Sequence, residues 1–303
     1  MTGICSEMKK YMCGDVLHVE GVRDFHLDHI FDCGQCFRWS RNEDGSYTGI
    51  AFGRVAKIAY DADKQLLMIH GADEDDFETI WRDYLDLGRD YGSIKAALAD
   101  RDPVIRDAIE YGHGIRILNQ EKWETLLSFI ISQNNNIPRI KKCIESLAET
   151  LGEYAGEYEG RKYYSLPTPE VLAAASLDDL APCRLGYRAK YLIETAKKVH
   201  AEGIDSLEAL GSSELSSGET CEALRGYCGV GPKVANCIAL FAMKKFDSFP
   251  IDVWVKKVMN TMYGFEENDL KGMAAFAAEK FGELGGIAQQ YLFYYITHLK
   301  EKS

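Results

Sequence analysis

The chain has 303 residues, enough for two or three domains, and its 46% hydrophobic content, with 13 Phe, 17 Tyr and 4 Trp, excludes an intrinsically disordered protein. Its formal net charge of −12 excludes a generally basic nucleic-acid coat protein, so any contact with DNA has to come from local patches and helix ends. The first 15 residues contain no apolar signal segment and no later run could span a bilayer, which predicts a soluble protein.

The nine cysteines are odd in number and unevenly spaced, which indicates reduced thiols in a cytosolic setting. Cys33 and Cys36 form a lone Cys-x-x-Cys pair, and no second pair follows at the spacing of a zinc site. We therefore expect no metal site built on cysteine.

The N-terminal region reads as short strands separated by polar turns. The expected strands are residues 36–39, 47–52, 55–60 and 66–70, with turns at 42–45 and 61–64. This pattern predicts an antiparallel meander. Gly34 stands where the chain enters the sheet, either as an ordinary bulge or turn glycine or as a point of close backbone approach to a ligand.

From residue 73 onward the periodicity is helical. The expected helices cover residues 73–87, 94–99, 103–111 and 123–132, resume at residue 169, and end with 283–299; residues 152–168 read as a surface excursion. The prediction is an α+β protein. An N-terminal antiparallel sheet domain with flanking helices, residues 1–112, precedes a mostly helical, two-part body, residues 113–303, whose last helices are free to pack back toward the first domain.

Two loops in the helical body carry residues suited to DNA. Asn134 begins a run of three asparagines, which breaks a helix. Because Asn tolerates the left-handed conformation of positive φ, the triplet favours a tight loop before a new helix with Pro138 in its first turn. Tyr187 and Arg188 open another helix after Gly186, and such a pair suits a wedge with a phosphate or base contact. The alternatives are a plain helix connector for the first loop and a half-buried core tyrosine in the second.

Residues 224–241 combine a glycine turn with a helix start. Gly229 and Gly231 flank Val230, so the backbone can take positive φ there and approach a ligand closely. Pro232 suits the first helical position, and the unpaired N–H groups and positive dipole end of the helix suit a phosphate.

Lys233 lies in the first turn of that helix, where the helix dipole and burial are both expected to lower its pKa and make the amine a nucleophile. Cys237 follows one turn later on the same face. Asp252, nineteen residues after the lysine, is placed to cap another helix. Individually, these features also fit a plain αα-hairpin, a solvated lysine and an ordinary N-cap.

In the last helix Gln289 and Phe293 are four residues apart and share a face, whereas Gln290 points about 100° away. An amide beside an aromatic ring suits a pocket that reads a flat heterocycle by hydrogen bonds and stacking. The alternative is a helix whose aromatic residues belong to the core.

In combination these segments resemble the 8-oxoguanine DNA glycosylase/lyase family of the helix-hairpin-helix superfamily, over a stretch from about Cys33 to Phe293. The matching segments are residues 33–39 (CGQCFRW), 114–118 (GIRIL), 133–139 (QNNNIPR), 185–189 (LGYRA), 224–241, 250–253 (PIDV) and 288–293 (AQQYLF). The C-terminal four-cysteine cluster of the iron–sulfur branch of that superfamily is absent, since Cys237 is the last cysteine.

The resemblance implies base-excision repair chemistry. Lys233 would attack the sugar C1′ and form a Schiff base that permits β-elimination, and Asp252 would stabilise charge and orient the lysine. The backbone of residues 229–231, with Lys233, would hold a DNA phosphate. Trp254 departs from the family pattern, because animal and yeast relatives carry a phosphate-contacting histidine at this position.

The resemblance also assigns the base pocket. Cys237 and Phe293 would sandwich the damaged base and Gln289 would meet its Watson–Crick edge. The carbonyl of Gly34 would accept the N7–H that 8-oxoguanine has and guanine lacks.

For the opposite strand, the resemblance places Asn134 in the space left by the flipped base and Tyr187 as a wedge. Arg139 and Arg188 would bond to the orphaned partner base, normally cytosine.

The partner expected from the resemblance is duplex DNA containing 8-oxoguanine, bound by a monomer in the cytoplasm or nucleoid, or in the nucleus of a eukaryote, with no membrane. No cofactor is expected, although the hairpin carbonyls can hold a structural monovalent or divalent cation. Two rival functions are a glycosylase for alkylated bases, which uses water and needs no Lys233, and a non-catalytic helix-hairpin-helix DNA-binding module.

Overall fold

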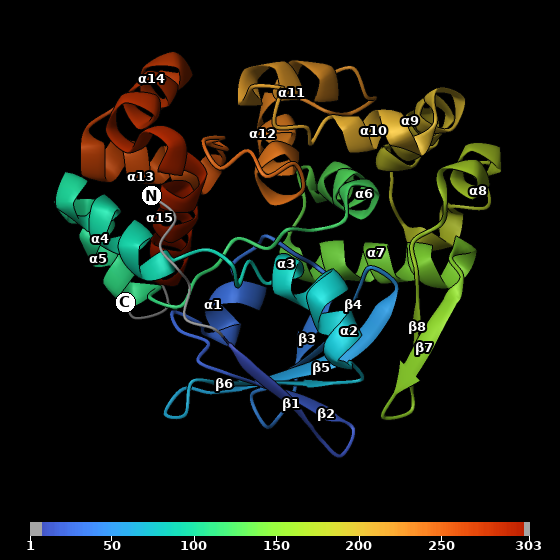
Figure 1. The fold of residues 1–303 in the computed structure, drawn as a ribbon. Helices are drawn as coiled ribbons and strands as arrows, with labels where there is room; N and C mark the ends of the chain where they lie inside the picture. The colour runs from blue at the N-terminus through green and yellow to red at the C-terminus, as the bar shows by residue number, and fades with distance from the viewer. Residues whose placement is uncertain (1–7, 300–303) are drawn as a thin grey trace.

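The computed structural model describes residues 8–299, so the start of the first expected domain and the end of the second lie outside it. The N-terminal part is a six-stranded antiparallel sheet in the order β1-β2-β6-β5-β4-β3 (Figure 1). Its strands are β1 (Lys9–Cys13), β2 (Val16–Glu20), β3 (Trp39–Arg41), β4 (Tyr47–Ala51), β5 (Arg54–Asp61) and β6 (Leu66–His70). The predicted antiparallel meander is confirmed.

Two sheet details differ from expectation. The strand predicted at residues 36–39 begins only at Trp39, because the preceding residues form a loop whose polar groups bond outside the sheet. Strands β1 and β2 were not among the expected strands, and β1 forms the sheet edge by pairing with β2.

From residue 73 onward the described helices agree with the helical periodicity, whereas α1 (Leu27–Phe31) lies in the region read as strands and was not predicted. The described helices are α1 (Leu27–Phe31), α2 (Glu74–Asp76), η1 (Phe77–Trp81), α3 (Arg82–Tyr84), α4 (Tyr91–Arg101), α5 (Pro103–Tyr111), α6 (Lys122–Ser132), α7 (Ile137–Leu151), α8 (Pro169–Ala174), η2 (Ala181–Cys183), α9 (Arg188–Glu202), α10 (Ile204–Ala209), α11 (Ser217–Leu224), α12 (Pro232–Phe241), α13 (Val253–Tyr263), α14 (Leu270–Phe281), η3 (Gly282–Leu284) and α15 (Gly285–Leu299). The surface excursion at 152–168 contains a hairpin that the sequence did not predict, β7 (Tyr154–Tyr158) and β8 (Arg161–Tyr164).

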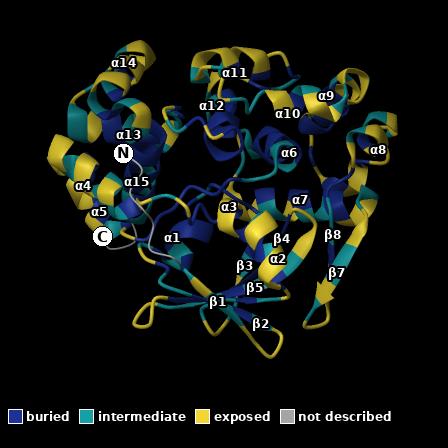
Figure 2. Cartoon of the chain, viewed as in Figure 1, coloured by how far each residue is buried: buried dark blue, intermediate teal, exposed yellow. Residues whose placement is uncertain are grey.

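The helical body has two parts (Figure 1). In one, α15 packs against α5 and α13, so the last helix returns to the first half of the chain. In the other, α6 packs against α7, α9 and α12. The buried residues gather between the elements, whereas the outer faces of the helices are exposed (Figure 2). No helix within residues 8–299 is long and apolar enough to cross a membrane.

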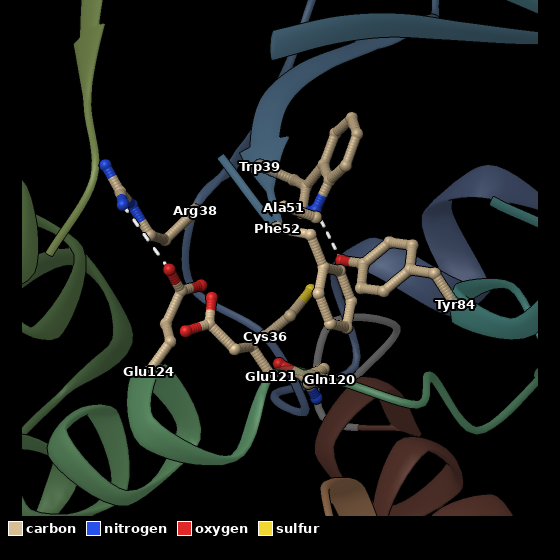
Figure 3. A pocket seen from close by; sticks show the side chains of 9 residues that line it. All are labelled: Cys36, Arg38, Trp39, Ala51, Phe52, Tyr84, Gln120, Glu121 and Glu124. Carbon is tan, nitrogen blue, oxygen red and sulfur yellow. Dashed lines mark hydrogen bonds and ion pairs between the residues drawn. The ribbon is translucent and has the colours of Figure 1, made fainter. Parts of the chain in front are cut away.

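A buried arginine joins the sheet to the helical body. Arg38 precedes β3, and its guanidinium lies 3.4 Å from Glu124, which belongs to α6 (Figure 3). The guanidinium also lies 3.0 Å from Glu145. It also donates to the Tyr164 carbonyl oxygen at 2.7 Å. Breaking a buried pair of this kind leaves an uncompensated charge, so Arg38 ties the two parts together strongly.

Candidate active site

The hairpin between α11 and α12 places its two glycines differently. Gly229 has a φ of +82°, and a Cβ there would lie 2.6 Å from Cδ2 of Tyr191, so this position needs glycine for both reasons. Gly231 has a φ of −88° and open space around it, so the expectation of positive φ is wrong at this position. Pro232 is the first residue of α12, as predicted.

Helix α12 presents Lys233 and Cys237 on one face, toward a cavity of about 60 Å³ that Asp252 also lines. The lysine Nζ lies 5.5 Å from the ring centroid of Phe129. Asp252 is indeed the N-cap of α13, because its Oδ1 accepts the backbone N–H groups two and three residues later at 3.0 and 2.8 Å. The plain-cap interpretation and the active-site interpretation therefore both apply to this carboxylate.

The pKa of Lys233 shifts in the direction opposite to the one that the sequence predicted. Burial by itself lowers this pKa, but the neighbouring Cys237 thiol and Asp252 carboxylate raise it, and the net direction is upward. Burial also raises the pKa of Asp252, against the opposing effects of its cap hydrogen bonds and Lys233. The predicted lowering is wrong in the free protein because it took account of the helix dipole and burial but not of the effects of Cys237 and Asp252. The resting side chain is an ammonium.

The opposite wall of the cavity comes from α15, where Gln289 and Phe293 share a face as predicted. Gln289 is buried, and its Oε1 has no hydrogen-bond partner among residues 8–299. A buried polar atom left without a partner is costly unless a ligand supplies one. This amide oxygen therefore points to a polar ligand in the cavity.

Gly34 has a φ of +77° and lies against Phe293, whose Cε1 would be 3.2 Å from a Cβ on the glycine. It sits in a loop before β3 rather than in a strand. Gly34 and Phe293 both line the cavity, so their close contact forms part of its wall.

Three buried or partly buried glutamines hold the Gly34 loop, and the sequence analysis missed all of them. Gln290 donates to the Cys33 carbonyl oxygen at 2.6 Å. Gln35 donates to the Arg116 carbonyl oxygen at 2.9 Å, and Gln120 donates to the Gln35 carbonyl oxygen at 2.7 Å. Gln35 and Gln290 lie inside segments that carried the family resemblance, and Gln120 follows another such segment by two residues, which was the available signal.

The asparagine loop lies beside the start of α9. Asn134 has a positive φ of 45°, as predicted for the triplet, and its Nδ2 lies 3.4 Å from the Tyr187 hydroxyl. Both side chains are exposed, with Tyr187 at 49%. Arg188 is buried and donates to the backbone carbonyl oxygens of Gln133, Asn134 and Leu185. In this conformation Arg188 fixes the loop.

Arg139 is exposed on α7, and its Nη2 donates to the Arg184 carbonyl oxygen at 3.2 Å. Trp254 is half-buried and packs against the helical core. Cys33 and Cys36 are buried free thiols, and residues 8–299 contain no group of three or more side chains suited to a metal ion. The structure thus brings the predicted catalytic and pocket residues together. Of the predicted DNA-facing residues, Asn134, Arg139 and Tyr187 are exposed near one another, whereas Arg188 is buried.

Two family models match consecutive segments of the chain. Residues 19–126 match the N-terminal domain of 8-oxoguanine DNA glycosylase, and residues 127–283 match the HhH-GPD superfamily of base excision DNA repair proteins. The second match alone covers more than half of the chain.

Relatives in other organisms support the same family assignment. An Arabidopsis thaliana N-glycosylase/DNA lyase is 30% identical over 88% of this chain and 76% of its own length. A Saccharomyces cerevisiae N-glycosylase/DNA lyase is 39% identical over 51% of this chain. The matched region spans only 43% of the yeast protein and 64% of a Methanothermobacter thermautotrophicus relative.

Among solved structures, MBOgg1 with a low-affinity DNA ligand is 45% identical, with a TM-score of 0.92 over 97% of this chain and 99% of its own. A Clostridium acetobutylicum 8-oxoguanine glycosylase/lyase bound to DNA with cytosine opposite the lesion is 44% identical, with a TM-score of 0.90 over the same shares. An Archaeoglobus fulgidus 3-methyladenine DNA glycosylase, 21% identical with a TM-score of 0.73 over 93% of this chain and 98% of its own, shares the fold. The chain therefore belongs to the 8-oxoguanine DNA glycosylase/lyase family, within the HhH-GPD superfamily of base excision DNA repair proteins.

Proposed function

We propose that this protein removes 8-oxoguanine from duplex DNA and then nicks the strand at the abasic sugar. The observation that carries the proposal is a single cavity in which Lys233 and Asp252 face the unpartnered amide of Gln289. A nucleophile, a carboxylate and a base-reading amide are the three groups that this chemistry needs. Two similar solved structures, MBOgg1 and a Clostridium acetobutylicum 8-oxoguanine glycosylase/lyase, are bound to DNA, and the second supports the same substrate.

The reaction begins with loss of a proton from the Lys233 ammonium once DNA fills the site. The free amine attacks C1′ of the flipped nucleotide, the glycosidic bond breaks, and its electron pair leaves with the base, which is protonated. Asp252 stabilises the positive charge that develops on the sugar. The C1′–O4′ bond then breaks, O4′ takes its electron pair and the proton that the attacking nitrogen loses, and the ring-opened sugar is an iminium. Electron withdrawal by the iminium allows loss of a C2′ proton and departure of the 3′ phosphate.

The residues of α15 that line the cavity and the Gly34 loop recognise the lesion. Gln289 offers an amide to the Watson–Crick edge, and Cys237 and Phe293 stack on the two faces of the base. The Gly34 carbonyl oxygen accepts the N7–H of 8-oxoguanine, whereas guanine has an unprotonated N7 and would repel it. The glutamine network that holds this loop makes such a single contact selective.

Opposite the lesion, Asn134 fills the space of the flipped nucleotide and Tyr187 wedges beside the orphaned base. Arg139, exposed at the same edge, bonds to cytosine. Arg188 joins it only after releasing carbonyl oxygens of the asparagine loop. We propose a monomer acting on duplex DNA in the compartment that holds the genome. The chemistry of Lys233 needs no cofactor, and a cation at the hairpin carbonyls stays a prediction.

Borohydride trapping tests the proposal most directly. Reduction of the reaction with an 8-oxoguanine:cytosine duplex is expected to give a covalent protein–DNA adduct, because borohydride reduces the iminium at Lys233. Lys233→Gln is expected to abolish the adduct, and Lys162→Gln, on an exposed strand of the β7–β8 hairpin, serves as the matched control.

Each rival function predicts another outcome. A glycosylase for alkylated bases that uses water would release its base without forming an adduct, and a non-catalytic DNA-binding module would bind without release. An adduct that persists in Lys233→Gln would place the nucleophile elsewhere.

A further inference from the structure

A second hollow lies beside the exposed edge that carries Asn134 and Tyr187. It is a groove of about 490 Å³ between the first half of α7 and the η2 turn, hereafter the α7–η2 groove. Three cations line it, Arg139 and Lys142 from α7 and Arg184 from the end of η2. The proposed reaction uses only the first of these.

The two further cations are not neutralised by the protein. The side chains of Lys142 and Arg184 are exposed, and neither forms an ion pair or a side-chain hydrogen bond within residues 8–299. None of the described residues that line the groove is Asp or Glu. In a chain of net charge −12, a groove lined by cations and free of carboxylates is a local site of positive potential. Its chemistry favours an anion.

The turn that carries Arg184 is fixed by the protein itself. Arg184 adopts a left-handed conformation, with φ 52° and ψ 37°, which costs a non-glycine residue roughly 1 kcal/mol or more. Its carbonyl oxygen accepts the Arg139 Nη2 at 3.2 Å and lies 3.9 Å from the Cys143 Sγ. The groove is therefore formed before any ligand binds.

The groove continues the candidate DNA interface. Asn136, which lines it, caps α7 two residues after Asn134, and Arg184 stands three residues before Tyr187. Arg139 belongs both to the groove and to the proposed contact with the orphaned base. The groove thus extends from that base along the strand that contains no lesion.

We propose that the α7–η2 groove binds the sugar–phosphate backbone of the strand opposite the lesion, with Lys142 and Arg184 paired to phosphates next to the orphaned base. This proposal rests on the proposed function for the position of the duplex. It assigns the opposite strand a phosphate site separate from the hairpin at Gly229, to which the family resemblance gives another DNA phosphate. Such contacts position the duplex and carry no sequence information.

The salt dependence of DNA affinity tests the proposal. Fluorescence anisotropy would give the Kd for a duplex with a tetrahydrofuran abasic analogue opposite cytosine at several salt concentrations. Each phosphate contact contributes about 0.9 to the slope of log K against log salt. The double variant Lys142→Gln/Arg184→Gln is expected to lower the slope by about 1 to 2, and Lys142→Gln alone by about 0.9.

The control is Lys162→Gln/Arg23→Gln, which removes the same charges from exposed positions on β8 and after β2. It is expected to leave the slope unchanged. Equal slopes in the control and the groove variant would overturn the proposal.

A second experiment identifies which DNA strand the α7–η2 groove binds. Neutral methylphosphonate linkages beside the orphaned base are expected to weaken binding to the wild type, with no further loss in the groove variant. If only linkages in the lesion strand matter, the groove does not hold the opposite strand. If inorganic phosphate binds the groove while the DNA slope is unchanged, the site serves a small anion and the proposal is wrong. These binding measurements need no base excision. If the proposed function fails, borohydride trapping shows it, and the binding measurements can still be interpreted.

Discussion

Asp252 has two roles at one position, because its Oδ1 caps α13 while its side chain lines the cavity with Lys233. The structural role needs only a hydrogen-bond acceptor, which Asn also provides. The chemical role needs a negative charge near the developing positive charge of the sugar. The two roles can therefore be separated by one substitution.

Asp252→Asn is expected to lower the single-turnover excision rate on the order of 10²-fold or more, because it removes charge stabilisation in the transition state. The melting temperature and the affinity for 8-oxoguanine DNA are expected to change little. An unchanged rate together with lower affinity or stability would show that Asp252 is only a helix cap.

Arg139 is the exposed cation at the edge next to Asn134, and its guanidinium can donate to O2 and N3 of an orphaned cytosine. Adenine presents an amino donor there, which would face the arginine donors. A good bidentate contact contributes roughly 1 to 3 kcal/mol of selectivity. Wild type is therefore expected to excise 8-oxoguanine faster opposite cytosine than opposite adenine, with part of this preference lost in Arg139→Met.

Single-turnover excision from duplexes that differ only in the opposite base measures this ratio. Lys162→Gln is the control for loss of a surface charge. The same cytosine-to-adenine ratio in wild type and Arg139→Met would mean that this arginine does not read the partner base.

At the scale of elements, the hairpin between α11 and α12 depends on two glycines for different reasons. Gly229 has positive φ and lies against Tyr191, whereas Gly231 is extended with open space around it. Gly229→Ala introduces both a strained backbone and a contact of 2.6 Å, so it is expected to destabilise the protein by about 1 to 3 kcal/mol.

Gly231→Ala is the matched comparison, and its free energy of unfolding is expected to stay within about 0.5 kcal/mol of wild type. It is nevertheless expected to weaken DNA binding, because a methyl group at the hairpin tip would meet the approaching phosphate. Urea denaturation and anisotropy give the two quantities. Equal destabilisation by both substitutions would refute the distinction between the two glycines.

At the scale of the whole molecule, the junction of the sheet with α6 buries ionisable groups that catalysis does not use. Glu121 lies there next to Glu124 and Arg38 (Figure 3). Burial, followed by the charges of Glu124 and Glu208, raises the pKa of Glu121 from its usual 4.5 to about 7. The folded protein therefore holds a proton on Glu121 that the unfolded chain loses.

Because the folded-state pKa exceeds the unfolded value, the contribution of this group is fully present below about pH 4.5 and is lost as the pH rises through about 7. Glu121→Gln is expected to flatten the fall in unfolding free energy between pH 5 and 8, by roughly 1 to 3 kcal/mol. Urea denaturation at several pH values measures this, with Glu157→Gln on the exposed face of β7 as control. Parallel pH profiles for wild type and Glu121→Gln would contradict the assignment.

The sequence by itself determined the structural features that depend on interactions between residues close together in the chain. Periodicity predicted the α+β organisation, and turn chemistry predicted the positive φ of Asn134 and the helix start at Pro232. Helical spacing placed Lys233 with Cys237, and Gln289 with Phe293, on shared faces that the structure confirms. These features depend on interactions within one or two turns of chain, which composition and spacing encode directly.

Only the tertiary structure decided what depends on distant segments. Gln290, assigned away from the pocket by its helical angle, holds the Gly34 loop from a position 257 residues along the chain from Cys33. The pKa of Lys233 is raised rather than lowered because Cys237 and Asp252 line the same cavity. Such hydrogen bonds and electrostatic effects fall off within a few ångströms, and those distances exist only after the sheet and both parts of the helical body have packed together.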